Sequence, residues 1–185
     1  MRYVKLDQKG LTIIELLAAI VLLTIVLSLA FSSYAFGVKS FQRANEQSEL
    51  QDQVRIVSHV ITSKLRYASE VELLSSCPTN LTEGFNYICM NSNKKTIDLH
   101  TYDKTTSAHK LQSLNTASSK HPITYDIAFQ KTNDHLLSYS LKSMADQQKF
   151  DVQSEILLLN LDLNAVSIKI TGSTPYQGIA FKENA

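Results

Sequence analysis

One carboxylate stands near the start of a long apolar segment, and its position requires a chemical reason. The chain opens with a short basic leader, Met1–Gly10, and then stays apolar from Leu11 to about Phe31 with Glu15 as its single charge. A carboxylate in hydrocarbon costs roughly 2.5–3.5 kcal/mol on insertion scales. We therefore expect Glu15 to have a function in assembly, with a position near the membrane interface and contact with water as the alternative.

The two cysteines, Cys77 and Cys89, are the next residues that could do chemistry. Their spacing is not the CxxC spacing of zinc and redox sites. If this part of the chain lies outside the cytoplasm, we expect a disulfide between them, with two unrelated buried thiols as the alternative. The bond would close a loop of about 13 residues and stabilise the fold by roughly 3 kcal/mol in the entropic account.

The sequence contains no recognisable catalytic or metal-binding motif. The histidines do not pair at metal-ligand spacing, and no GxSxG, P-loop or HExxH pattern occurs. We therefore expect a protein that is not an enzyme and that has no cofactor or metal. We interpret all five histidines as surface or hairpin residues: His59, His100, His109, His121 and His135.

A long helix is expected to position Glu15. The 21 residues of Leu11–Phe31 would span about 31 Å as a helix, which matches the core of a bilayer. Beyond them, apolar residues recur three and four positions apart and predict an amphipathic continuation to about Ala68. This second part has one apolar stripe that a domain could cover: Leu50, Val54, Val57, Ile61, Leu65 and Ala68.

After a turn-rich stretch, the apolar period changes from that of a helix to that of strands. The pattern predicts an α+β fold, in which a long N-terminal helix packs on an antiparallel sheet. Its strands are expected at Phe85–Met90, Thr96–Tyr102, Ile123–Gln130, Leu136–Leu141, Ile156–Leu163 and Val166–Ile170. Short polar hairpins are expected at Lys131–Asp134 and Asn164-Ala165.

Three further segments have a less regular pattern. Asp103–Lys120 is rich in Ser, Thr and Lys, and we expect a long exposed loop. Ile179–Phe181 is expected as an edge strand in an irregular tail. The apolar run Leu157–Leu159 predicts a central strand buried on both faces against the helix, with a partner-facing strand as the alternative.

The charge of the chain limits its partners. Net charge is +1: the leader contributes +2, because Arg2, Lys5 and Lys9 outnumber Asp7, and the rest of the chain contributes −1. A nearly neutral chain does not support nucleic acid or acidic lipid as a main partner. A basic flank beside an apolar segment favours a cytoplasmic location for the leader.

The junction at Lys9-Gly10 resembles the class III signal of type IV pilins and pseudopilins. In that family a membrane peptidase cuts after the glycine and usually methylates the new N-terminus, and the fifth mature residue is Glu. The resemblance implies cleavage between Gly10 and Leu11, N-methylation of Leu11 and an assembly role for Glu15. It also implies the lollipop shape of that family, with a leader at 1–10, a membrane helix at 11–31, its extracytoplasmic continuation at 32–70 and a head at 71–185.

The expected role of Glu15 follows from the new N-terminus. Cleavage gives Leu11 a free amine, which needs an anion once it enters an apolar core of packed helices. Glu15 of a neighbouring subunit could supply that anion, in an ion pair that sets the axial register. The implied partners are a prepilin peptidase, other pilin or pseudopilin subunits, an assembly platform protein with its ATPase, and membrane lipid before assembly.

The membrane helix contains neither Pro nor Gly, which favours a minor pilin or minor pseudopilin over a major pilin. Phe150–Asn160 also looks like the late sheet segment of J-type minor pseudopilins. We expect a single-pass protein of the cytoplasmic membrane that enters a cell-surface or periplasmic filament. The first hypothesis is a type IV pilus or competence DNA-uptake filament, and the second is a type II secretion pseudopilus.

Two hypotheses outside filament assembly remain. Ser28-Leu29-Ala30 fits the small-x-small pattern of an ordinary secretory signal, which would give a mature chain that starts at Phe31. The other hypothesis is a single-pass membrane-tethered binding domain that makes no filament.

Overall fold

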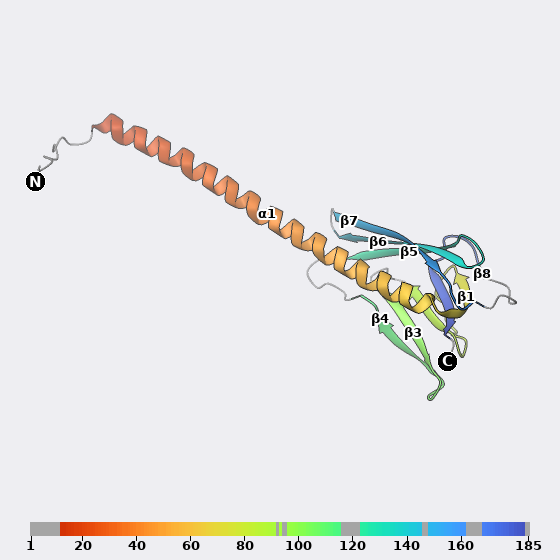
Figure 1. Ribbon diagram of the computed structural model, residues 1–185. Coiled ribbons are helices and arrows are strands. Elements are labelled where there is room, and N and C mark those ends of the chain that lie inside the picture. The colour runs from red at the N-terminus through yellow and green to blue at the C-terminus, as the bar shows by residue number, and fades with distance from the viewer. Residues whose placement is uncertain are drawn as a thin grey trace, which may run out of the picture. The chain divides into compact units, whose positions relative to one another are not determined.

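A computed structural model describes residues 12–91, 93, 96–115, 123–145, 148–161 and 168–183. The chain divides into two compact units, the first of which ends at Ala44 and the second of which begins at Asn45. Helix α1, Ile13–Leu65, contributes to both units (Figure 1). Its 53 residues correspond to about 80 Å of helix.

The first unit is the apolar part of α1. Its large apolar side chains are exposed around the whole helix, from Ile13 to Phe41, and the segment is long and apolar enough to cross a membrane. No Gly or Pro interrupts it before Gly37. The predicted apolar helix is therefore present in the structure.

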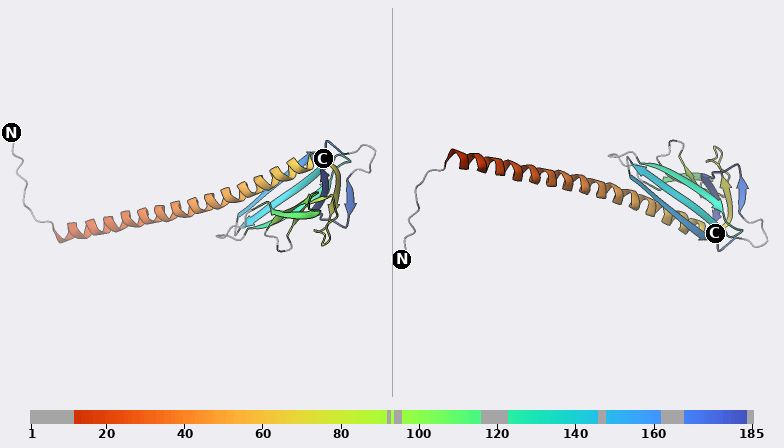
Figure 2. Two further views of the ribbon diagram at one scale, coloured as in Figure 1. Left: turned by 90° about the horizontal axis from the view of Figure 1, so that it is seen from below. Right: turned by 90° about the horizontal axis from the view of Figure 1, so that it is seen from above.

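The second unit contains nine described strands in two sheets. The larger sheet has the order β4-β3-β2-β9-β1-β8, and the smaller one has the order β5-β6-β7. Figure 2 shows β5, β6 and β7 side by side as one layer. The strand bounds are β1 Ala68–Leu74, β2 Asn86–Met90, β3 Ile97–Asp103, β4 Ala108–Ser113, β5 Thr124–Lys131, β6 Leu136–Ala145, β7 Gln148–Leu157, β8 Lys169–Thr171 and β9 Gly178–Glu183.

The predicted α+β class is confirmed, but the single antiparallel sheet is not. All strand pairs are antiparallel except β1 with β8, which is parallel. The two sheets meet where the amide of Phe129 donates to the carbonyl of Tyr176, at 2.8 Å, just before β9. The parallel pairing of β8 with β1, which lies far away in the chain, makes the larger sheet mixed, and no local sequence pattern indicates it.

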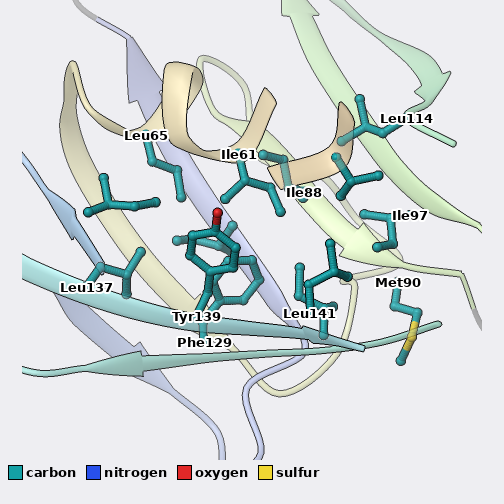
Figure 3. Packing of buried hydrophobic residues seen from close by; sticks show 14 of the residues in the cluster. Ile61, Leu65, Ile88, Met90, Ile97, Leu114, Phe129, Leu137, Tyr139 and Leu141 are labelled. Atoms are coloured by element: carbon teal, nitrogen blue, oxygen red, sulfur yellow. The ribbon is translucent and has the colours of Figure 1, made fainter. Parts of the chain in front are cut away.

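The core lies between the amphipathic part of α1 and both sheets. The predicted helix stripe is buried, and it belongs to one cluster with Ile88 and Ile97 of the larger sheet and Leu137 and Leu141 of the smaller one (Figure 3). The Tyr139 hydroxyl enters this contact, because it lies 2.5 Å from Ser58 Oγ on α1. The spacing of three and four residues therefore predicted the packing face of the helix correctly.

The helix ends at Leu65, slightly before the expected Ala68, which instead begins β1. Ala68 is still fully buried, so the apolar period runs from the helix into the strand without a break. Sequence reasoning missed β1 because Ala68 still fits the helical spacing and only Val71 and Leu73 show the alternation of a strand.

Two expected segments differ from the structure near the smaller sheet. The expected strand Ile156–Leu163 is wrong, because β7 begins at Gln148 and ends at Leu157. The apolar run there is not buried on both faces, since Leu157 is 56% and Leu159 is 54% exposed, whereas Leu158 is buried. The hairpin at Lys131–Asp134 does connect β5 to β6.

Two more expectations fail in the larger sheet. The expected loop Asp103–Lys120 contains β4, a mostly exposed edge strand whose polar side chains give no apolar alternation. The expected edge strand Ile179–Phe181 is part of β9, which lies between β2 and β1. In the predicted strand Val166–Ile170, the described part forms β8 from Lys169, and the hairpin Asn164-Ala165 lies outside the described residues.

Candidate functional site

The first turn of α1 holds Glu15 in a reciprocal arrangement with Thr12. The Thr12 amide and hydroxyl both donate to Glu15 Oε2 at 3.0 Å, and the Glu15 amide donates to Thr12 Oγ1 at 3.4 Å. This is a capping box, in which a Thr and a Glu three residues apart satisfy amides at the start of a helix. A carboxylate in the first turn also interacts favourably with the helix dipole.

The capping box leaves Glu15 able to accept a further bond. Both hydrogen bonds from Thr12 end on Oε2, whereas a carboxylate offers about four lone-pair sites on two oxygens. An ammonium group could therefore bind the carboxylate while Thr12 keeps it oriented. The other predicted residues of this site, Gly10 and Leu11, lie outside the described residues.

Thr12 is the residue whose role sequence reasoning missed here. A Thr followed by Glu three residues later is a recognised signal of a helix N-terminus. In the structure, the capping bonds between Thr12 and Glu15 also stabilise the start of the helix at Ile13. The same carboxylate is thus a helix cap and a candidate assembly residue.

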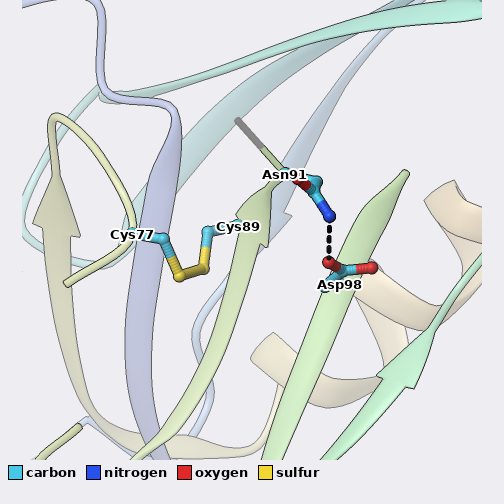
Figure 4. The surroundings of a disulfide bond; sticks show 4 residues. All are labelled: Cys77, Cys89, Asn91 and Asp98. Atoms are coloured by element: carbon cyan, nitrogen blue, oxygen red, sulfur yellow. Dashed lines mark hydrogen bonds between the residues drawn. A yellow bond between two sulfur atoms is a disulfide. The ribbon is translucent and has the colours of Figure 1, made fainter. Parts of the chain in front are cut away.

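The second predicted feature, the disulfide, is present in the larger sheet. Cys77 and Cys89 are joined with an S–S distance of 2.00 Å and a Cα–Cα distance of 5.5 Å (Figure 4). The bond ties the segment between β1 and β2 to β2 itself. In addition to the disulfide, a hydrogen bond from the Thr82 amide to the Tyr87 hydroxyl, at 2.9 Å, holds the same segment.

This segment covers a small second core on the outer face of the larger sheet. Tyr87, Cys89 and Ala180 are buried there. The partly buried residues that cover them come mostly from the segment that the disulfide holds: Leu74, Cys77, Leu81 and Phe85. Loss of the disulfide should therefore expose part of this core as well as lengthen the free loop.

Replacement of both cysteines by alanine is expected to lower the free energy of unfolding of the second unit by about 3 kcal/mol. Urea unfolding of the full-length protein in detergent micelles measures the change. Reduction of the wild-type protein should lower the midpoint to a similar degree and should leave the double variant unchanged. A midpoint that does not respond to reduction would show that the disulfide contributes nothing to stability.

His100 lies beside the disulfide, and His109 lies nearby among aromatic rings. A ring nitrogen of His100 and both sulfurs lie within 4.8 Å of one another, but sulfurs bonded to each other do not offer the thiolates that a metal requires. His109 contacts the rings of Tyr87 and Tyr102, with centroids 5.8 and 5.2 Å away. Its Nε2 lies 2.9 Å from the Phe85 carbonyl, so it links β4 to the covering segment.

The remaining histidines are dispersed. His59 is exposed on α1, and His135 is partly buried in the turn before β6. His121 lies outside the described residues. The prediction of surface or hairpin positions fits His59 and His135, and it also fits His100 and His109, which are partly buried on the paired strands of the β3–β4 hairpin.

His100 is expected to make stability depend on pH. Burial lowers its pKa below the ordinary 6.5; Asp98 opposes this shift, and His109 adds to it. Because the unfolded chain then binds the proton more readily, stability is complete above pH 6.5 and falls as the pH drops through the folded pKa. His100→Gln should flatten this part of the urea-midpoint profile between pH 7.5 and 4.5, as measured on the full-length protein, and an unchanged slope would exclude His100 as its source.

Comparisons with known proteins concern the N-terminal segment and the overall fold. The prokaryotic N-terminal methylation motif matches residues 5–31. The pilin-like protein PilA3 of Thermus thermophilus is 34% identical over 61 residues, which are 33% of this chain and 26% of that protein.

Two solved structures resemble the fold. The PilB minor pilin from Streptococcus sanguinis aligns with 78% of this chain and 35% of its own, at a TM-score of 0.54 and 15% identity. A point mutant of the same protein gives a TM-score of 0.56 at 16% identity, with 77% and 35% of the two chains covered. At these identities the likeness establishes the fold, and this chain spans only about a third of those structures.

Proposed function

We propose that this chain is a minor pilin, a structural subunit of a type IV pilus or competence filament, because its N-terminal motif and its fold resemble those of type IV pilin-like proteins. The methylation motif at residues 5–31 carries this proposal, because it begins in the basic leader and includes Glu15. The names of the similar proteins, a pilin-like protein and a minor pilin, favour a pilus over a secretion pseudopilus.

In this proposal the N-terminus is processed before assembly. A prepilin peptidase cuts between Gly10 and Leu11 and methylates the new amine of Leu11. Inside a bundle of packed helices that amine binds Glu15 of a neighbouring subunit. The capping box supports this role, because Thr12 holds the carboxylate at the start of the helix and leaves it capacity for another donor.

The proposed location follows from the apolar helix and the disulfide. The helix inserts into the cytoplasmic membrane with the basic leader inside, and the head faces the other side. A disulfide persists outside the reducing cytoplasm, which fits a head in the periplasm or at the cell surface. Other pilin subunits, with the assembly platform and its ATPase, are then the partners that move the protein into a filament.

Filament fractionation tests the proposal directly. Filaments sheared from cells that express the native chain should contain it together with other pilin subunits, and a strain without the assembly ATPase should retain it in the membrane. A membrane-tethered domain that makes no filament would stay in the membrane fraction of both strains. That result would overturn the proposal.

A further inference from the structure

The outer face of the smaller sheet has a depression of about 800 Å³, here called the outer trough. Its floor consists of two neighbouring rungs of side chains that cross all three strands. One rung is Ala128, Ser140 and Gln153, and the next is Gln130, Ser138 and Glu155. These positions alternate with buried residues such as Ile127, Phe129 and Tyr139, so the floor faces away from the core.

The segment Thr174–Tyr176 forms one wall of the outer trough. It is held beside β5 by the hydrogen bond from the Phe129 amide to the Tyr176 carbonyl, at 2.8 Å. Tyr176 packs against the core, and the exposed Pro175 lines the trough. Since β6 is paired on both sides, the floor presents side chains and not a free backbone edge.

The chemistry of the lining limits the ligand. It contains no Lys, Arg or His, and Glu155 is its one ionisable carboxylate. The neighbouring rung adds Asp126, Lys142 and Asp151, which carry a further negative charge together. An anionic ligand would therefore be repelled, and an apolar ligand would leave the amide, carboxylate and hydroxyl groups without partners.

We propose that the outer trough binds a neutral saccharide chain. Gln130, Gln153 and Ser140 can each both donate and accept hydrogen bonds, and Glu155 accepts them. Ser138 Oγ already donates to the Gln130 carbonyl at 3.3 Å and can accept from a ligand. Neighbouring sugar hydroxyls also donate and accept, so they match a lining of this kind. The volume lies within the range of small-molecule sites. A peptide strand pairs its backbone at a sheet edge; in the smaller sheet that edge is β7, beside the floor, whereas the floor itself presents side chains.

Binding of neutral oligosaccharides to the full-length protein tests this inference. The protein is held in micelles of lauryldimethylamine oxide, which has no sugar headgroup, and is titrated with tetra-N-acetylchitotetraose, maltotetraose and a galactose tetrasaccharide, all of which are neutral. Saturation-transfer NMR should detect at least one of them with a Kd below about 5 mM. Gln153→Ala should weaken that binding about tenfold, and Ser140→Trp, which fills the floor, should abolish it.

Lys149→Ala is the matched control, because Lys149 is exposed on the same face of β7 but does not line the outer trough. It should leave the affinity unchanged, and far-UV circular dichroism of every variant should match the wild type. If Ser140→Trp does not fold, the test depends on Gln153→Ala alone, which should fold because Gln153 is exposed. Three results would each overturn the proposal: no binding of any of the three sugars at about 10 mM, which is above the expected Kd; binding that is unchanged in the Gln153 variant; or competition from a heparin tetrasaccharide or an uncharged peptide.

Discussion

Glu15→Gln is expected to leave membrane insertion intact and to reduce incorporation into filaments at least about a hundredfold. Glutamine can keep the capping box with Thr12, so the helix should still begin at Ile13, but the charge that pairs with the amine of a neighbouring subunit is lost. Removal of one partner of a buried ion pair costs about 3–5 kcal/mol, and 1.4 kcal/mol corresponds to about a factor of ten. Quantitative immunoblots of membrane and sheared-filament fractions measure the ratio.

The matched control for the charge is Thr12→Val. This variant removes the Thr12 hydroxyl, which both donates to Glu15 Oε2 and accepts from the Glu15 amide, and it keeps the carboxylate. It should weaken the helix start by about 1 kcal/mol and should still enter filaments. If Glu15→Gln were incorporated as well as the wild type, the ion pair would be excluded, and Glu15 would be only a helix cap.

Phe181→Ala is expected to lower the free energy of unfolding of the second unit by about 3–5 kcal/mol. Phe181 is fully buried in the main core, and its strand β9 lies between β2 and β1. Removal of the ring therefore leaves a cavity in the middle of the larger sheet. The change is measured by urea unfolding of the full-length protein in micelles, with near-UV circular dichroism as a second probe.

Leu157→Ala provides the comparison for this cavity, because Leu157 is 56% exposed at the end of β7. Its effect should stay within about 0.5 kcal/mol, as is usual for surface substitutions. The two variants should differ by several kcal/mol. If both variants changed the free energy of unfolding by a similarly small amount, β9 would not lie in the middle of the sheet. The C-terminal segment would then be the edge strand that the sequence predicted.

The parts of the fold that could be predicted are those with a strong local period. The stripe on α1 recurs every three or four residues, and all of its helical members from Leu50 to Leu65 are buried. Tyr125, Ile127 and Phe129 face the core in β5 and alternate with Thr124, Asp126, Ala128 and Gln130, which do not. In both cases one side chain pattern reports one buried face.

The strands that were missed, such as β4, or misplaced in the sheet, such as β9, lack that local pattern. In β9, Gly178–Phe181 is buried on both faces and short, so it could not be told from a small edge strand. In β4 nearly every side chain is exposed, and its place is set by pairing with β3. Partners distant in the chain decide both positions, and spacing within one segment does not contain that information.

The candidate site shows the same division. Glu15 and the cysteine pair were predicted because a charge in an apolar segment and two isolated cysteines are visible in the sequence alone. The outer trough was not predicted, because its floor is made by the register of three strands and its wall comes from Thr174–Tyr176. Small polar residues on an exposed strand face give no signal until the register is known.

The most direct test of the account is the intact mass and N-terminal sequence of the protein recovered from filaments. We predict a chain that begins at Leu11 and carries one additional methyl group on its amine, together with co-purified pilin subunits. A chain that retains Met1 in its working state, or one that begins at Phe31, would contradict the account, since neither could place a methylated amine opposite Glu15.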